Sequence, residues 1–180
     1  MLLSVVILVV YFAAWAALHS LTASYAVKGW ARRLFGGDRW YRLAYNALAV
    51  FTGLPLAILF FWLPDRTLYR VPAPWLWAML AIEGLAALGI FLALLQTGLF
   101  SFLGLTRQPA ASPGRLQVRG FYCWVRHPLY ALGLVVIWLW PFMTVNYLTL
   151  VICFTIYLYV GSLFEEKRLL AEFGEAYRDY

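Results

Sequence analysis

Long runs of apolar residues, separated by short polar segments, dominate this 180-residue chain. A helix that crosses the hydrocarbon core of a bilayer needs ~20 mostly apolar residues, within a range of roughly 17–25. Three runs meet that requirement: Leu2 to Leu18, Ala44 to Leu63 and Trp75 to Leu95. They predict three membrane-spanning helices, of which the second is kinked at Pro55 and the third is interrupted only by Glu83.

A fourth apolar stretch, Leu129 to Phe164, is too long for a single crossing. Its interruption at Trp140 and Pro141, with Asn146 just beyond, divides it into two helices joined by a tight turn. The chain is therefore predicted to be all-α, an integral membrane bundle of five transmembrane helices.

Two of the flanking polar segments predict additional helices. The residues from Trp30 to Tyr45 are basic and aromatic, which suits an interfacial helix lying against anionic headgroups. The residues from Phe164 to Tyr180 place apolar side chains at helical spacing among Glu and Arg, which predicts a C-terminal amphipathic helix that folds back on the bundle. Because no internal repeat separates these parts, residues 1–180 are expected to form a single membrane domain.

The composition excludes a soluble fold. Hydrophobic residues make up 64% of the chain and charged residues 12%, and the mean hydropathy is +0.78. A soluble domain carries roughly 25% charged and 45–50% apolar residues, so a soluble globule and intrinsic disorder are both excluded. Cys123 adjoins a basic loop and Cys153 lies inside an apolar run, which argues against a framework disulfide and against a zinc site.

The net charge of +6 is unevenly distributed. With five crossings, 12 of the 14 basic residues fall on one side of the membrane, and only Arg66 and Arg70 fall on the other. Lys and Arg accumulate in cytoplasmic loops, so the amino terminus is expected outside and the carboxyl terminus, with its amphipathic helix, in the cytoplasm. Membrane lipids are the partners that this distribution predicts, and no nucleic-acid partner is expected.

Two polar clusters lie at predicted cytoplasmic ends of spans: the loop from Arg115 to Tyr130 and the pair Glu165-Glu166. The hairpin begins just after the first cluster and ends just before the second, so its antiparallel helices bring the two together. Acidic groups at a membrane boundary are costly unless they are wet, paired or functional. Each feature alone also has an ordinary explanation: the glutamates as a solvated helix turn, Arg126 as a positive-inside anchor and Pro128 as a helix start.

Together, the two clusters resemble a known family. The segment GFYCWVRHPLYALG (Gly120 to Gly133), a hairpin and then EEKRLLAEFGEAYRDY (Glu165 to Tyr180) are similar to the isoprenylcysteine carboxyl methyltransferase superfamily. The pattern there is G-x-Y-x-x-x-R-H-P-x-Y-x-x-G, two spans, and E-E-x-x-L-x-x-x-F-G-x-x-Y-x-x-Y, and the match covers the last third of the chain. Phospholipid N-methyltransferases share much of this pattern. Sterol and steroid reductases share the histidine-proline-x-tyrosine element but resemble this chain less after it.

The resemblance implies a methyltransferase that binds S-adenosylmethionine at the cytoplasmic face, through residues 107–180, without a metal. Carried over by position, the cofactor contacts are Leu116, Gln117, Tyr122, His127, Pro128, Leu129, Tyr130 and Glu165. A carboxylate suits the sulfonium and ammonium charges of this cofactor, and tyrosine rings can face adenine or the cation. The protein chiefly aligns the reactants. Glu166 and His127 are the candidate bases for an acceptor that must lose a proton, and the sequence does not choose between them.

Two further observations concern the methyl acceptor: one departure from the family pattern, and a second, looser resemblance. Prenylcysteine enzymes place an arginine for the substrate carboxylate where this chain has Gly161, so a substrate with a free carboxylate is not expected. Through WAALHS (Trp15 to Ser20) and PFMT (Pro141 to Thr144), the chain is more loosely similar to a bacterial branch of methanethiol-type thiol S-methyltransferases and NnrU-group proteins. This implies a bacterial inner-membrane enzyme for a small or lipid-like acceptor of the thiol or prenylcysteine type. The alternatives are a phospholipid N-methyltransferase and a non-catalytic, NnrU-like accessory protein.

Two titratable residues inside predicted spans are weaker candidates for an acceptor site. His19, at the cytoplasmic end of the first span, is either an interfacial histidine bonded to a neighbouring carbonyl or part of an acceptor pocket. Glu83 lies in mid-membrane, where an unpaired carboxylate costs ~2.5–3.5 kcal/mol. It is therefore expected to be protonated or bonded within the bundle, and it is a candidate for the lining of a lipophilic tunnel.

Overall fold

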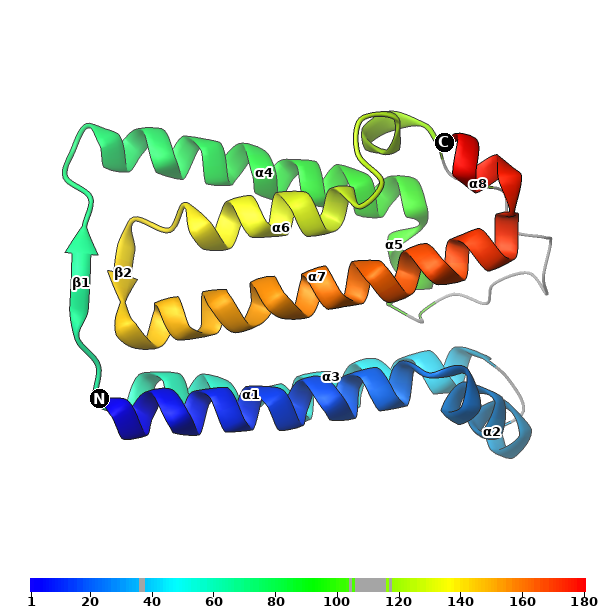
Figure 1. The fold of residues 1–180 in the computed structure, drawn as a ribbon, viewed down its shortest axis with the longest axis horizontal. Coiled ribbons are helices and arrows are strands. Elements are labelled where there is room, and N and C mark those ends of the chain that lie inside the picture. Colours follow the sequence, from blue (N-terminus) through cyan, green and yellow to red (C-terminus); the bar gives the residue numbers. More distant parts are fainter. Residues whose placement is uncertain (36–37, 104, 106–115, 117) are drawn as a thin grey trace. The chain divides into compact units, whose positions relative to one another are not determined.

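The computed structural model describes residues 1–35, 38–103, 105, 116 and 118–180. Along the chain (Figure 1) the elements are α1 (Leu2–Ala23), α2 (Tyr25–Phe35), α3 (Asp38–Trp62), β1 (Thr67–Arg70), α4 (Trp75–Thr97), α5 (Leu99–Phe102), the 3-10 turn η1 (Gly120–Cys123), α6 (Pro128–Trp138), β2 (Phe142–Thr144), α7 (Val145–Phe173) and α8 (Glu175–Asp179). The described residues form two compact units. The first unit comprises those of Met1–Arg70, Thr97–Pro109 and Met143–Cys153, and the second those of Val71–Gln96, Ala110–Phe142 and Phe154–Tyr180.

Four helices in the described part of the chain are long and apolar enough to cross a membrane. They are α1, the segment Tyr41–Trp62 of α3, α4 and α7. The prediction of a helical integral membrane bundle is thereby confirmed. The fourth predicted span corresponds to α6, which has only 11 residues and a length of about 16 Å. It is shorter than the ~30 Å hydrocarbon core, so the described part of the chain contains four helices of full length where five were predicted.

Helix boundaries differ from the prediction in two places. The basic aromatic segment 30–45 is not a single helix, because α2 ends at Phe35 and α3 begins at Asp38. The C-terminal amphipathic segment does not begin a new helix at Phe164, because α7 continues to Phe173 without a proline to end it. The chain turns only at Gly174, whose φ of +58° is a left-handed conformation that glycine adopts at little cost.

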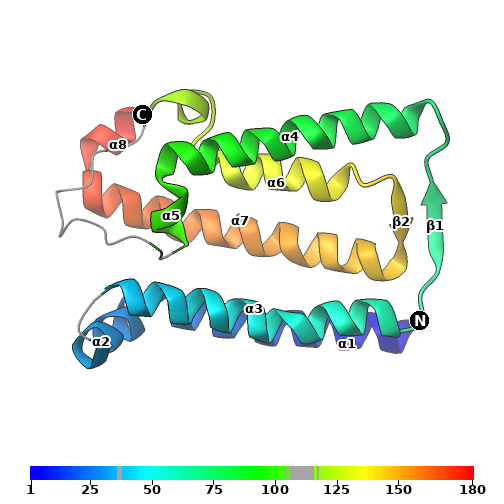
Figure 2. The ribbon, with the colours of Figure 1, turned by 180° about the vertical axis from the view of Figure 1, so that it is seen from behind.

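In the first unit, α1 and α3 lie side by side along their length, as Figures 1 and 2 both show. Polar tips of aromatic side chains on α1 hydrogen-bond to the backbone of α3. The Tyr11 hydroxyl donates to the Thr52 carbonyl at 2.8 Å, and Trp15 Nε1 donates to the Ala49 carbonyl at 3.2 Å. Such interhelical hydrogen bonds help to hold membrane helices together, because lipid provides little hydrophobic driving force between them.

Two short strands, which the all-α prediction did not include, join distant loops of the chain. β1 pairs with β2 in a two-stranded sheet. Next to this pair, the buried Asn146 donates its side-chain amide to the Leu63 carbonyl at 3.3 Å, and its backbone N–H to Asp65 Oδ1 at 3.0 Å. The predicted break in the last apolar stretch is confirmed, since α6 ends at Trp138 and α7 begins at Val145.

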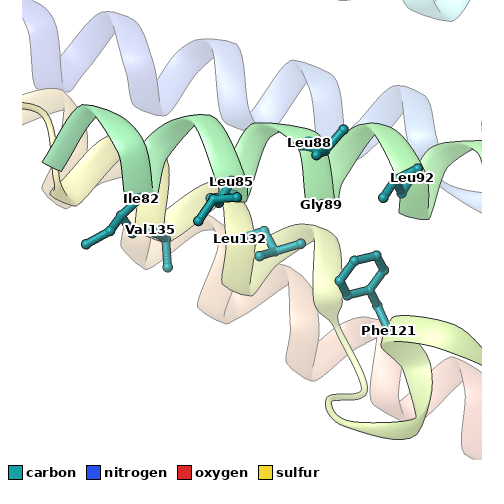
Figure 3. Close-up of a pocket in the computed structure, with 9 residues that line it drawn as sticks. Ile82, Leu85, Leu88, Gly89, Leu92, Phe121, Leu132 and Val135 are labelled. Carbon is teal, nitrogen blue, oxygen red and sulfur yellow. The ribbon is translucent and has the colours of Figure 1, made fainter. Parts of the chain in front are cut away.

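In the second unit, α6 approaches α4 closely at a glycine. A Cβ atom added to Gly89 would lie 3.0 Å from a terminal side-chain carbon of Leu132 on α6, so the Leu132 side chain would have to shift to accommodate a larger residue. An open apolar groove of about 370 Å³ follows this contact (Figure 3). Its lining comes from α4, from α6 and from Phe121 of η1, which stands at one end of the groove in Figure 3.

Candidate functional site

The RHPLY segment is placed by ordinary rules of helix initiation. His127 is the N-cap of α6, and Pro128 occupies the first turn, where its missing N–H has no helical partner to lose. The His127 carbonyl accepts the backbone N–H groups of Tyr130 and Ala131 at 3.1 and 3.0 Å. These bonds fix the backbone of His127 at the start of α6, and its ring is turned toward α7.

Helix α7 supplies two carboxylates to that ring. Glu165 and Glu166 are adjacent, so their side chains leave the helix ~100° apart. Nδ1 of His127 lies 3.4 Å from Glu165 Oε2, and Nε2 lies 2.8 Å from Glu166 Oε1. One imidazole is thus bracketed by two carboxylates, and only the doubly protonated ring can donate to both.

The two carboxylates have different surroundings. Glu166 accepts from three side chains: His127 Nε2 and the Tyr177 hydroxyl at Oε1, each at 2.8 Å, and Arg126 Nη1 at Oε2, at 3.1 Å. Charge-assisted hydrogen bonds of this kind hold an ionised carboxylate firmly. Glu165 is more exposed, at 39% against 31%, and makes the longer contact with His127. Glu165 is therefore the carboxylate with more capacity left for a ligand.

Helix α8 closes on the same residues. The Arg126 guanidinium lies over the rings of Tyr177 and Tyr180, at 5.3 and 5.9 Å from their centroids. The Tyr180 hydroxyl donates to the backbone carbonyl of Tyr122 in η1, and Figure 1 shows α8 beside the loop that carries η1. Three separate segments, the η1–α6 loop, α7 and α8, therefore meet in one polar and aromatic cluster.

Glycine is required where η1 begins. Gly120 has a φ of +66°, and a Cβ atom there would clash with the side-chain amide of Gln96 at the end of α4. The backbone conformation disfavours a side chain at this position, and Gln96 would also have to move to make room for one. The turn that presents Tyr122 to the cluster thus depends on a residue that the sequence pattern already marked.

The phenols of the cluster are held in their protonated form. Burial raises the pKa of Tyr177 to about 12, and its hydrogen bond to Glu166 acts in the same direction. Burial also raises the pKa of Tyr122, with a further contribution from the negative charge of Glu165. Burial raises the pKa of Tyr180 as well. These hydroxyls are therefore hydrogen-bond donors throughout the neutral pH range.

The raised pKa of Tyr177 predicts that the stability of the protein depends on pH. Because the pKa of Tyr177 is raised in the folded state, to about 12 from its ordinary 10.0, its contribution to stability is complete below pH ~10 and is lost as pH rises toward 12. We expect the free energy of unfolding, measured in detergent by circular dichroism, to fall more steeply across this window in the parent protein than in Tyr177→Phe. Tyr69→Phe, which removes an exposed phenol from β1, is the control and should keep the parental slope. Equal slopes in all three proteins would contradict the prediction.

The structure brings most of the sequence-predicted site residues together. Those in the cluster are Tyr122, His127, Pro128, Tyr130, Glu165 and Glu166, and the ring of Tyr130 stacks on His127 with centroids 5.4 Å apart. Leu116 and Leu129 are half-buried. Gln117 lies outside the described residues. Arg126, Tyr177 and Tyr180 were not among the predicted contacts, although the arginine of R-H-P and the two tyrosines of the tail pattern are present in the sequence.

The two weaker candidates have their own surroundings. His19, in the first unit, stacks on Trp15 at 5.1 Å, and its Nε2 lies 2.6 Å from the Tyr45 hydroxyl. Glu83, on α4 of the second unit, is 8% exposed, and its Oε1 has no hydrogen-bond partner within the described part of the chain. The roles of both residues in acceptor binding stay predictions.

Comparison with known proteins identifies the family. No protein-family model matches the chain, and no solved structure does. The methanethiol S-methyltransferase of Pseudomonas sp. (strain GM41(2012)) is 31% identical over 189 residues, an alignment that covers 99% of this chain and 70% of the relative. The chain belongs to the methanethiol S-methyltransferase family.

Other methanethiol S-methyltransferases are similar to this chain as well. The methanethiol S-methyltransferase of Crocosphaera subtropica is 31% identical over 173 residues, covering 90% of this chain and 66% of its own. The methanethiol S-methyltransferase of Mycobacterium tuberculosis is 44% identical over 64 residues, an alignment that covers 36% of this chain and 26% of the relative. The chain spans about two thirds of the length of the relatives that it matches throughout. The resemblance to the isoprenylcysteine carboxyl methyltransferase superfamily and its bacterial thiol S-methyltransferase branch is confirmed.

The names of these methanethiol S-methyltransferases imply a methyl donor, and the cluster fits a cationic one. Glu165 presents a partly exposed carboxylate, which is the side chain that a positively charged ligand prefers. Tyr122 lies close enough to feel the charge of Glu165, and the ring of Tyr130 stacks on His127. Such rings can stack on a flat heterocycle or face a cation. The donor set of this family member therefore suits a ligand that combines an aromatic base with positive charge.

Proposed function

We propose that this chain catalyses methyl transfer from S-adenosylmethionine to a small thiol, at the cytoplasmic face of a bacterial inner membrane. The observation that carries the proposal is the bracket of His127 between Glu165 and Glu166, beside the rings of Tyr122 and Tyr130. The thiol acceptor is supported by the relatives named methanethiol S-methyltransferase. The absence of an arginine at Gly161 agrees with an acceptor that carries no carboxylate.

S-adenosylmethionine supplies a methyl group activated by a sulfonium charge. In the proposed site, Glu165 holds the positive charge of the cofactor, and Tyr122 and Tyr130 contact its adenine or its cation. The remaining contacts are those carried over by position: Leu116, Gln117, His127, Pro128 and Leu129. Alignment of the acceptor with the methyl group is the main contribution of such a site.

Residues of this chain would remove the proton of the acceptor thiol. A thiol reacts as its thiolate, so a base must take the proton. Glu166 is committed to three donors, whereas a neutral His127 that donates Nε2–H to Glu166 leaves Nδ1 able to accept. When the thiol S–H bond breaks and an N–H bond forms at Nδ1, the resulting imidazolium meets a carboxylate at each nitrogen. We therefore assign His127 as the base and Glu166 as its partner.

The apolar groove supports an acceptor that arrives through the bilayer. Ile82, Leu85 and Leu92 of α4 and Leu132 of α6 line it, and Phe121 lines the end shown beside η1 in Figure 3. Phe121 is the immediate neighbour of Tyr122 in η1. A lining without charged residues favours a neutral, apolar molecule.

For the membrane topology we propose five crossings, within the single membrane domain expected from the sequence. The fourth would consist of the short α6 together with the extended residues that follow it. The pairing of β1 with β2 supports this topology, because it joins two loops that five crossings place on the same, outer side. The amino terminus would then lie outside and the carboxyl terminus in the cytoplasm, in agreement with the distribution of basic residues.

Calorimetric titration of the detergent-purified protein with S-adenosylhomocysteine tests the proposal, with NADPH as the control ligand. We expect saturable binding of S-adenosylhomocysteine alone, and conversion of methanethiol to dimethyl sulfide when S-adenosylmethionine is added. A folded sample that binds neither ligand would overturn the proposal in favour of an accessory protein. Methylation of phosphatidylethanolamine in place of the thiol would instead indicate a phospholipid N-methyltransferase.

A further inference from the structure

Tyr177, in the C-terminal helix α8, contacts the candidate site. Helix α7 ends at Phe173, and the left-handed turn at Gly174 reverses the chain into α8. This reversal buries Tyr177, which is 3% exposed, and brings its hydroxyl back to Glu166, eleven residues earlier in the sequence. The contact is a hydrogen bond of 2.8 Å from the phenol to Glu166 Oε1.

That carboxylate oxygen has a second donor. His127 Nε2 also lies 2.8 Å from Glu166 Oε1, so one atom joins the phenol and the imidazole. Arg126 holds the other oxygen at 3.1 Å, and its guanidinium also lies over the Tyr177 ring. The orientation of the Glu166 carboxylate therefore depends on a donor from α8 as well as on donors from the loop before α6.

We propose that Tyr177 is a positioning residue for the methyl transfer reaction. Its hydroxyl fixes the Glu166 carboxylate, and through it the ring of His127, so that the Nδ1 edge stays turned toward Glu165. Without this donor, only His127 and Arg126 hold the Glu166 carboxylate, and its terminal torsion gains freedom, since such torsions have broad minima. The role of Tyr177 in catalysis rests on the proposed function, whereas its effect on the His127 ring does not.

Histidine NMR of the whole protein separates these two statements, because the chain contains only two histidines. In protein labelled with ¹⁵N-histidine, Tyr177→Phe should shift or broaden the ring nitrogen signals of His127 and leave those of His19 in place. Tyr11→Phe is the matched control, since it removes a hydroxyl whose hydrogen bond is also 2.8 Å long, in the first unit. Glu166→Gln, which perturbs the other side of the same contact, should move the same His127 signals. It serves as the second variant if Tyr177→Phe does not fold.

Kinetics then test the catalytic consequence. We expect Tyr177→Phe to lower kcat for methanethiol roughly five- to tenfold, the effect of losing a typical hydrogen bond, because His127 and Arg126 still hold the Glu166 carboxylate. The affinity for S-adenosylhomocysteine and the KM for the thiol should change less than about threefold, because Glu165 and the groove are untouched. In a Glu166→Gln background, Tyr177→Phe should lower kcat by a markedly smaller factor, since the two residues act through one contact.

The outcomes are distinct. Unchanged His127 signals in folded Tyr177→Phe would overturn the positioning role, whatever the activity. Altered signals together with an unchanged kcat would show that the ring is positioned by Tyr177 but that methyl transfer does not depend on it, which overturns the proposal as stated. A parent protein that binds no S-adenosylhomocysteine and methylates no thiol would overturn the proposed function itself, while the NMR result would still decide how the ring is held.

Discussion

Replacing Glu165 with alanine should strongly weaken the binding of S-adenosylhomocysteine while the protein still inserts and folds. The physical reason is the loss of the one carboxylate of the pair that keeps an exposed surface for a cationic group. A charge-assisted contact in a partly dry site is worth about 1.5–3 kcal/mol, which corresponds to a loss of affinity of roughly 10- to 100-fold. Calorimetric titration of parent and variant, at matched protein concentration, measures it.

The control for this experiment is Glu175→Ala. Glu175 is a carboxylate of the same C-terminal region, and it pairs with Arg178 at 2.5 Å on the surface, with 73% of its side chain exposed. A surface pair of this kind contributes little, so the affinity should stay at the parental value. If folded Glu165→Ala bound S-adenosylhomocysteine with unchanged affinity, the result would contradict the placement of the cofactor site at this cluster.

Replacing His127 with alanine should lower kcat for thiol methylation by about 100- to 1000-fold, the range expected when a general base is lost. The deficit should shrink as pH rises, by about tenfold per unit, until the acceptor thiol ionises by itself. This follows because a preformed thiolate no longer needs the base. The measurement is the pH profile of dimethyl sulfide formation in parent and variant.

Trp124→Ala is the control for His127→Ala. Trp124 lies in the same loop but is 87% exposed, so its removal tests whether any change in this segment lowers activity. We expect kcat within about twofold of the parent for this variant. A His127→Ala protein that keeps more than a tenth of the parental kcat, or whose deficit is the same at every pH, would contradict the role of base.

Parts of the fold were predictable because they depend on local properties. The apolar length of a segment decides whether it can cross a bilayer, and the proline at 141 cannot donate the backbone hydrogen bond that a continuous helix would need there. The amphipathic helix predicted over Phe164 to Tyr180 is instead the end of α7 followed by α8, because charged residues such as Glu165 do not end a helix, and the chain turns only at the left-handed Gly174. The pairing of β1 with β2 could not be foreseen, since strands of four and three residues are too short to show a periodic pattern.

For the site, the sequence by itself determined the chemical groups and the family, since R-H-P-L-Y and the paired glutamates lie in short contiguous motifs. The resemblance carried Glu165 over as a cofactor contact and left Glu166 as a candidate base beside His127. Tertiary structure added the difference between their surroundings, because the three donors to Glu166 come from positions 40, 39 and 11 residues away. The number of hydrogen bonds a carboxylate accepts depends on which segments meet around it, and only the folded chain brings Arg126, His127 and Tyr177 to the same carboxylate.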